Sequence, residues 1–227
     1  MKKSVLNLVL FLMLAGQPGI SADLKLDNGQ LNASDLSVRQ QLATRLEAIS
    51  ASPEQYADAL YHGQRRANLC KVCHGEDGNS VKEGTPNLAG QDPVYIVDQF
   101  NRYADGRRID YWMGSLAASF SDEDKIKLAI FYAAQTTKPA RGGNRQLIEQ
   151  GKRLYQTLCV ECHGEDGRSK DGYARLAGQR PEYTAKMLKE FRSPSGRRYN
   201  PLMYARAFML RSDEEIEAVA TYLAHLE

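Results

Sequence analysis

The sequence predicts an all-α protein that contains two copies of one helical unit. Apolar residues recur with the helical period of about 3.6 residues, and no segment shows the apolar–polar alternation of a strand. Two short segments occur twice: Cys-His-Gly-Glu-Asp-Gly at 73–78 and 162–167, and Leu-Ala-Gly-Gln at 88–91 and 176–179. Such repetition indicates a duplicated structural unit. The composition, 42% hydrophobic and 26% charged over 227 residues, is that of an ordinary globular protein.

Residues 1–22 have the features of a secretory signal peptide. Two lysines follow Met1, an apolar run extends from Val5 to Ala15, and small residues precede a cleavage site after Ala22. The run is too short to cross a bilayer, which needs about 20 apolar residues, so an uncleaved anchor is the weaker alternative. We therefore expect the chain to be exported and to mature outside the cytoplasm.

Residues 23–50 form an extension before the first unit. Val38, Leu42, Leu46 and Ile49 lie at helical spacing, which predicts one apolar stripe on a helix. We expect this helix to cap the first unit. A partner-docking helix and a loose tail are the alternatives.

The first unit is predicted to span 51–135. Ser52 followed by Pro53 is a helix start, and this helix leads into Cys70. A second helix is expected at Pro93–Tyr103. The last begins at Ser121, which is followed by acidic residues that favour the positive end of a helix.

The second unit, 145–227, repeats this order. Its helices are predicted at Gln146–Cys159 and Pro181–Phe191, and from Ser212 onward. Residues 136–144 are predicted to form a linker, because a proline and two glycines in this segment interrupt a helix.

The net charge gives no reason to expect a nucleic-acid partner. Two of the 30 basic residues and none of the 28 acidic residues lie in the signal peptide, so the mature chain is neutral. A neutral chain lacks the basic footprint that nucleic acid attracts.

All four cysteines belong to two Cys-x-x-Cys-His motifs, the attachment signature of c-type haem. Two thiols one helical turn apart can each bond a vinyl group of one porphyrin, and the next side chain then presents its imidazole to the iron. The sequence therefore predicts two covalently attached haems. The residues assigned to them are Cys70, Cys73, His74, Cys159, Cys162 and His163.

Three other interpretations explain the cysteines less well. Disulfides in an exported chain would not require two paired motifs with no cysteine left over. A zinc site needs about 15 to 20 residues between its Cys-x-x-Cys pairs, whereas Cys73 and Cys159 are 86 positions apart. A redox-active Cys-x-x-Cys is expected in a βαβ setting, which neither motif has.

The iron also needs a ligand on its other face. His62 and His225 have no counterpart in the other unit, so we expect them to be surface or core residues. Methionine is then the remaining ligand type. Gly-Arg-Arg occurs at 106–108 and 196–198, an offset of 90 that aligns Met113 with Met203.

Met113 and Met203 lie 39 and 40 residues after their histidines, far enough for the chain to cross the ring and approach from the opposite face. The predicted iron ligands are therefore His74 with Met113, and His163 with Met203. Met187 is expected to be a packing residue. Met209 is also expected to pack, and it is the second choice if Met203 is not a ligand.

Histidine and methionine together fill both axial positions of the iron. A filled site leaves no place for substrate and suits the passage of single electrons. A dihaem enzyme such as a peroxidase would need one open or displaceable position. The sequence therefore predicts an electron-transfer protein rather than an enzyme.

From Gly63 to the C-terminus the chain resembles the dihaem class I cytochromes of the c4 type. The resemblance rests on Cys-x-x-Cys-His with Gly-Glu-Asp-Gly, then Leu-Ala-Gly-Gln, an aromatic helix, a methionine, Ser-Asp-Glu and a last helix, all present twice. It implies two tandem class I cytochrome c domains. It also implies a periplasmic carrier, soluble or loosely associated with membrane complexes. Such a carrier takes single electrons from a dehydrogenase or a quinol-oxidising complex and passes them to an acceptor such as a terminal oxidase.

The nearest alternative is the haem subunit of a flavocytochrome c sulfide dehydrogenase, which takes electrons from a flavoprotein subunit. In the c4-type family, which the chain resembles, the backbone carbonyl of a proline orients the imidazole of the histidine that binds the haem iron. Pro86 matches this pattern, and Ala174 departs from it in the second unit. Because any backbone carbonyl can accept from Nδ1, we expect Ala174 to do the same.

Further side chains are predicted to surround the haems. The repeated arginines stand just before each methionine, where charge-assisted hydrogen bonds to haem propionates are possible. A solvated basic turn is the alternative. Trp112 and Tyr204 are expected to wall the pockets beside the methionines. The arginines concerned are Arg107, Arg108, Arg197 and Arg198.

Overall fold

The computed structural model describes residues 33–193, 197–198 and 200–227. The expected signal peptide, 1–22, lies outside the described residues. Within these ranges the regular elements are helices, together with one isolated antiparallel bridge between Arg108 and Arg198. The prediction of an all-α fold is confirmed.

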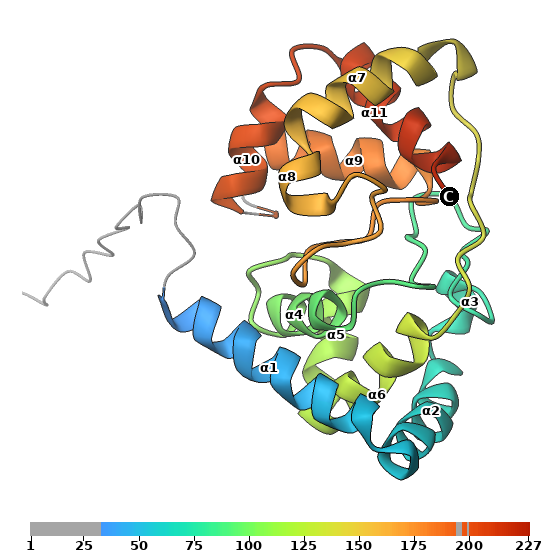
Figure 1. The fold of residues 1–227 in the computed structure, drawn as a ribbon, viewed down its shortest axis with the longest axis vertical. Helices are drawn as coiled ribbons and strands as arrows, with labels where there is room; N and C mark the ends of the chain where they lie inside the picture. The colour runs from blue at the N-terminus through green and yellow to red at the C-terminus, as the bar shows by residue number, and fades with distance from the viewer. Residues whose placement is uncertain (1–32, 194–196, 199) are drawn as a thin grey trace, which may run out of the picture.

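The helices form two stacked units, joined by a segment that runs along one side of the molecule (Figure 1). The helices of the first unit are α1 (Ala33–Ala51), α2 (Pro53–Ala67), α3 (Lys71–His74), α4 (Pro93–Ala104), α5 (Tyr111–Ser119) and α6 (Asp122–Ala133). Those of the second are the 3-10 turn η1 (Arg145–Leu147), α7 (Ile148–Leu158), α8 (Val160–His163), α9 (Pro181–Arg192), α10 (Pro201–Phe208) and α11 (Asp213–His225). No helix of the described ranges is long and apolar enough to span a bilayer.

Serine side chains cap three of the helices whose starts the sequence predicts. Ser52 accepts a hydrogen bond from a backbone N–H in the first turn of α2, and Ser121 does the same for α6. Ser212 caps α11 in the same way. Each cap satisfies an N–H group that has no partner within its helix, so these helix starts are set by local sequence.

In each unit the helix that leads into the cysteine motif, α2 or α7, crosses the last helix, α6 or α11, closely. Gly63 lies where α2 meets α6, and a Cβ atom there would collide with the carbonyl oxygen of Lys127 and come within 2.7 Å of Phe131 Cβ. Gly151 occupies the same place between α7 and α11, against Ala218 and Tyr222. Because both crossings depend on glycine, the helix that leads into each cysteine motif has a fixed position on its core.

Helix α1 packs on the first unit. Leu46 is buried in the first core, with Leu42 and Ile49 against it, and the three match the apolar stripe expected from the sequence. Val38 does not, because it is 55% exposed. The N-terminal part of α1 instead approaches the second unit, where the Arg39 guanidinium donates to the carbonyl of Gly172.

Candidate functional site

Both Cys-x-x-Cys-His motifs form the same short helical turn. Helix α3 follows α2 and helix α8 follows α7, with Cys70 and Cys159 as the N-terminal flanking residues. The backbone N–H of His74 donates to the Cys70 carbonyl over 2.9 Å, and that of His163 donates to the Cys159 carbonyl over 3.0 Å. The first cysteine and the histidine of each motif are thus separated by one helical turn, as attachment of one porphyrin requires.

No disulfide joins the four cysteines in the part of the chain that the structure describes. Burial raises the pKa of the Cys70 thiol, and it raises the pKa of the Cys159 thiol to about 12. No group of three or more His, Cys, Asp or Glu side chains in the described ranges is placed to hold a metal ion. The structure therefore gives no support to the disulfide and zinc alternatives.

Both motif histidines are buried and face a backbone carbonyl. His74 Nδ1 lies 3.0 Å from the carbonyl oxygen of Pro86, and His163 Nδ1 lies 2.8 Å from that of Ala174. Because a carbonyl only accepts, Nδ1 carries the proton and Nε2 keeps the lone pair that can bind iron. Burial lowers the pKa of both imidazoles, which favours this neutral form. The expectation that Ala174 would replace the proline carbonyl is confirmed.

Met113 and Met203 occupy the same position in two short helices, α5 and α10, which were not among the helices expected from the sequence. Each methionine is the third residue of its helix. The N–H of Met113 donates to the Asp110 side chain, and that of Met203 to the Asn200 side chain, both over 3.0 Å. Both methionines are half-buried, and each packs against the core of its own unit.

The other methionines and histidines lie in different settings. Met209 is 52% exposed at the end of α10, and Met187 is buried beneath the Arg198 guanidinium. His62 faces Asp58 on the surface of α2. His225 bonds to a carbonyl within α11. None of the four has an equivalent in the other unit.

Two of the four predicted arginines meet between the units. Arg108 donates to Gln99 and to the Tyr183 hydroxyl, each over 2.7 Å. Arg198 donates to the Tyr95 hydroxyl over 2.7 Å and, at longer range, to Tyr183. Their backbones also form the isolated bridge between the units. The tyrosines of α4 and α9 thus hold two guanidinium groups together.

The described partners of these two guanidinium groups are tyrosine hydroxyls, the Gln99 amide, the Met187 sulfur and aromatic rings. None of these partners is a carboxylate, so the positive charge is not balanced within the described residues. Burial raises the pKa of Tyr183, but the two arginines outweigh burial and lower it to about 8. An anionic group would be stabilised here. The cluster therefore fits the carboxylates of haem propionates, as the sequence predicts for Arg108 and Arg198.

The neighbouring arginines point elsewhere. Arg107 forms an ion pair with Asp105 over 2.6 Å, with both side chains close to half exposed, and Arg197 is exposed. A propionate role for these two has no support in the structure. Trp112 and Tyr204 are exposed and contact the rings of Tyr111 and Phe208 respectively, so their role as pocket walls stays a prediction.

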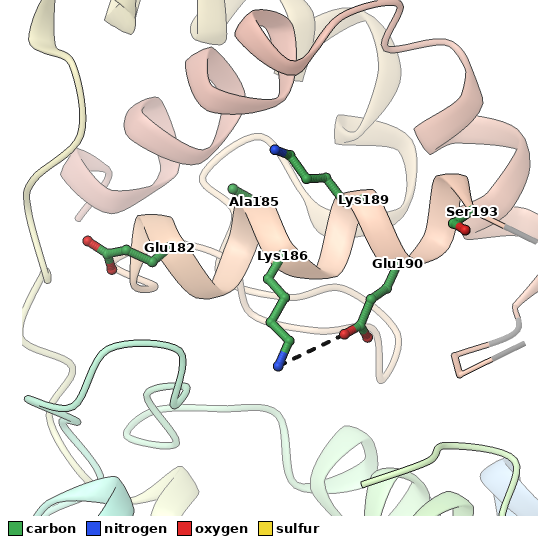
Figure 2. A pocket seen from close by; sticks show the side chains of 6 residues that line it. All are labelled: Glu182, Ala185, Lys186, Lys189, Glu190 and Ser193. Atoms are coloured by element: carbon green, nitrogen blue, oxygen red, sulfur yellow. Dashed lines mark ion pairs between the residues drawn. The ribbon is translucent and has the colours of Figure 1, made fainter. Parts of the chain in front are cut away.

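A surface hollow on α9 is not part of these sites. It is lined by Glu182, Ala185, Lys186, Lys189, Glu190 and Ser193, and Figure 2 shows that these side chains come from one helix and the residue after it. Lys186 and Glu190 form an ion pair across it. With no cysteine, histidine or methionine in its lining, this hollow offers iron no ligand of the predicted kinds.

Two pairs of residues in these sites were not singled out from the sequence. Asp110 and Asn200 cap the helices that carry the methionines. An Asp or Asn three residues before each methionine is a sequence signal for a helix start. Gln91 and Gln179 end the Leu-Ala-Gly-Gln turns and are buried polar residues. Both glutamines belong to the repeated Leu-Ala-Gly-Gln segment, but nothing in the neighbouring sequence indicates what they contact.

Comparison with known proteins identifies the family. A cytochrome c family model matches residues 148–227. Cytochrome c4 of Azotobacter vinelandii is 32% identical over 186 residues, which cover 72% of this chain and 87% of that protein. A thiosulfate dehydrogenase electron acceptor of Stutzerimonas stutzeri is 32% identical over 175 residues, covering 70% of this chain and 80% of that protein.

A solved structure agrees with these sequence relationships. Reduced recombinant cytochrome c4 from Pseudomonas stutzeri superposes with a TM-score of 0.68 at 30% identity, covering 74% of this chain and 98% of that one. The duplicated cysteine motifs and the helical fold are consistent with this likeness. The chain therefore belongs to the cytochrome c4 family of dihaem electron-transfer proteins and carries two covalently attached c-type haems.

Proposed function

We propose that this chain is a periplasmic carrier of single electrons in which His74 with Met113, and His163 with Met203, hold the two irons. The observation that carries the proposal is the repeated imidazole geometry. In both units a buried histidine next to the cysteine pair donates Nδ1–H to a backbone carbonyl. This bond fixes the tautomer and leaves Nε2 free to bind the iron.

The shared helix register supports the methionine assignment. Met113 and Met203 occupy the same capped position of α5 and α10, whereas Met209 lies at the far end of α10. When bound, each haem supplies one-electron redox chemistry. The protein supplies the ligands, the low-dielectric surroundings and two cations, the buried Arg108 and the half-buried Arg198, whose charge favours the reduced haem.

Methionine replacement tests the ligands. Met113→Ala or Met203→Ala should turn one haem high-spin and lower its potential, while the mass of the protein still shows two attached haems. Met187→Leu and Met209→Leu are matched controls that should leave the spectrum unchanged. An unchanged spectrum in both alanine variants, or a spectrum altered by Met209→Leu instead, would refute the ligand pairs.

We further propose that a dehydrogenase acting on a sulfur compound is a donor, with a terminal oxidase as the acceptor. The likeness to a thiosulfate dehydrogenase electron acceptor favours this donor class. The oxidised protein should be reduced rapidly by thiosulfate only when a thiosulfate dehydrogenase is present. Reduction by sulfide through a flavoprotein subunit would favour the flavocytochrome alternative. Steady turnover of peroxide or sulfide by the purified chain alone would show that it is an enzyme.

A further inference from the structure

The two Leu-Ala-Gly-Gln turns meet at the contact between the units. Each turn ends in a glutamine that is only 6% exposed, Gln91 in the first unit and Gln179 in the second. A buried amide has a donor and an acceptor that both need partners. Both glutamines find those partners on the backbone of the other unit.

The two contacts have the same geometry. Gln179 Oε1 accepts from the Asn87 N–H over 2.8 Å, and its Nε2 donates to the Asn87 carbonyl over 3.0 Å. Gln91 Oε1 accepts from the Arg175 N–H over 2.6 Å, and its Nε2 donates to the Arg175 carbonyl over 3.0 Å. Each glutamine therefore holds one residue of the other unit by two hydrogen bonds.

The residues held in this way follow directly after the carbonyls that orient the imidazoles. The N–H of Asn87 and the C=O of Pro86 belong to one planar peptide group, and so do the N–H of Arg175 and the C=O of Ala174. A hydrogen-bonded chain thus runs from Gln179 through one peptide group to His74. A second chain runs from Gln91 to His163.

We propose that Gln91 and Gln179 are crossed positioning residues, each of which sets the orientation and basicity of the axial imidazole in the other unit. This inference rests on the proposed function, because it takes His74 and His163 as iron ligands. The glutamine of one unit thereby adjusts the redox potential of the haem in the other unit.

The direction of the change in redox potential follows from the direction of the hydrogen bonds between the glutamine and the histidine. A peptide whose N–H donates has a more polarised carbonyl, since hydrogen bonds in a chain strengthen one another. The carbonyl then accepts more strongly from Nδ1–H, which raises the basicity of the ligand and stabilises oxidised iron. Loss of the glutamine should therefore raise the potential of the haem in the opposite unit.

Gln91→Met and Gln179→Met in the full dihaem protein test the proposal, because methionine keeps the length of the side chain without its amide. Gln91→Met should shift the oxidised-to-reduced ratio of the second haem about two- to fivefold, or roughly 20–40 mV at 59 mV per tenfold change. The redox potential of the first haem should not change. Gln179→Met should give the reverse pattern.

The potentials are measured by spectroelectrochemical titration, and each haem is assigned by its paramagnetically shifted NMR signals, including the Nδ1 proton of its histidine. Thr137→Val is a matched neutral control, because it removes a hydrogen bond to the Ala89 carbonyl in the same turn and touches neither peptide group. It should change neither potential.

Gln91→Glu is a second variant that keeps the acceptor and the shape of the side chain. It should not raise the potential of the second haem. A rise as large as that of Gln91→Met would overturn the proposal, as would shifts in the same unit as the replaced glutamine or equal shifts in both. In those cases both haems would still be attached and six-coordinate, whereas failure of the proposed function would leave the imidazoles unligated.

Discussion

Replacement of Gly63 with alanine tests how closely α2 and α6 must cross to position the first haem motif. An added Cβ would collide with the carbonyl oxygen of Lys127 and lie 2.7 Å from Phe131 Cβ. The carbonyl belongs to the backbone of α6, so no side-chain rotation removes the collision. The helices must instead move apart at the point where α2 leads into Cys70.

The expected loss of stability is the balance of two effects. Overpacking of a tight core costs about 1–3 kcal/mol, and a backbone collision places this case near the upper value. Alanine favours a helix over glycine by about 1 kcal/mol, which offsets part of the cost. The net loss is about 2 kcal/mol, which lowers the melting temperature of a domain of this size by roughly 8–16 °C.

Thermal unfolding of the holoprotein, followed by circular dichroism and by haem absorbance, measures this effect. Gln64→Ala changes the adjacent exposed residue of α2, so it serves as a control that should leave the first transition nearly unchanged. Gly151→Ala should have the corresponding effect on the second unit. A Gly63→Ala protein as stable as the original, or more stable, would refute the argument that the crossing distance requires glycine.

Two further predictions concern attachment and acid stability. Cys70→Ala should impair haem attachment in the first unit only, and mass spectrometry of proteolytic fragments checks this; loss from both units would contradict independent attachment. Hydrogen bonds from Lys189 and Arg192 lower the pKa of Asp213 below its usual value of 3.8, so its stabilising effect is present above that value and is lost as the pH falls through the lowered pKa. The difference in melting temperature between the original protein and Asp213→Asn should therefore shrink as the pH falls below 3.8 and through the lowered pKa, and a difference independent of pH would contradict this assignment.

Much of the fold was predictable because its signals are local. The serine caps of α2, α6 and α11 act on N–H groups within three residues, so a short window of sequence contains the whole interaction. The cysteine motifs are equally local, since one helical turn joins each thiol pair to its histidine. The helices that carry Met113 and Met203 were not predicted, although their capping residues, Asp110 and Asn200, are also local signals.

Other features depend on contacts between distant residues. Arg107 and Arg108 are neighbours of identical chemistry, yet one pairs with Asp105 at the surface and the other is buried between the units. Val38 follows the same apolar period as Leu46, but no core lies beneath it. Periodicity places residues on a face, and only packing decides whether that face is covered.

The sequence by itself determined the helical class, the duplication and the haem-attachment chemistry. The helical period and the cysteine motifs are each contained in a short window, and the duplication shows as short segments that occur twice. The tertiary structure alone decided how the two units are coupled. Gln91 and Gln179 reach peptide groups 84 and 92 positions away in the chain. Such contacts exist only after both turns have folded and docked, since the stacking of the two units is what brings each amide to its partner.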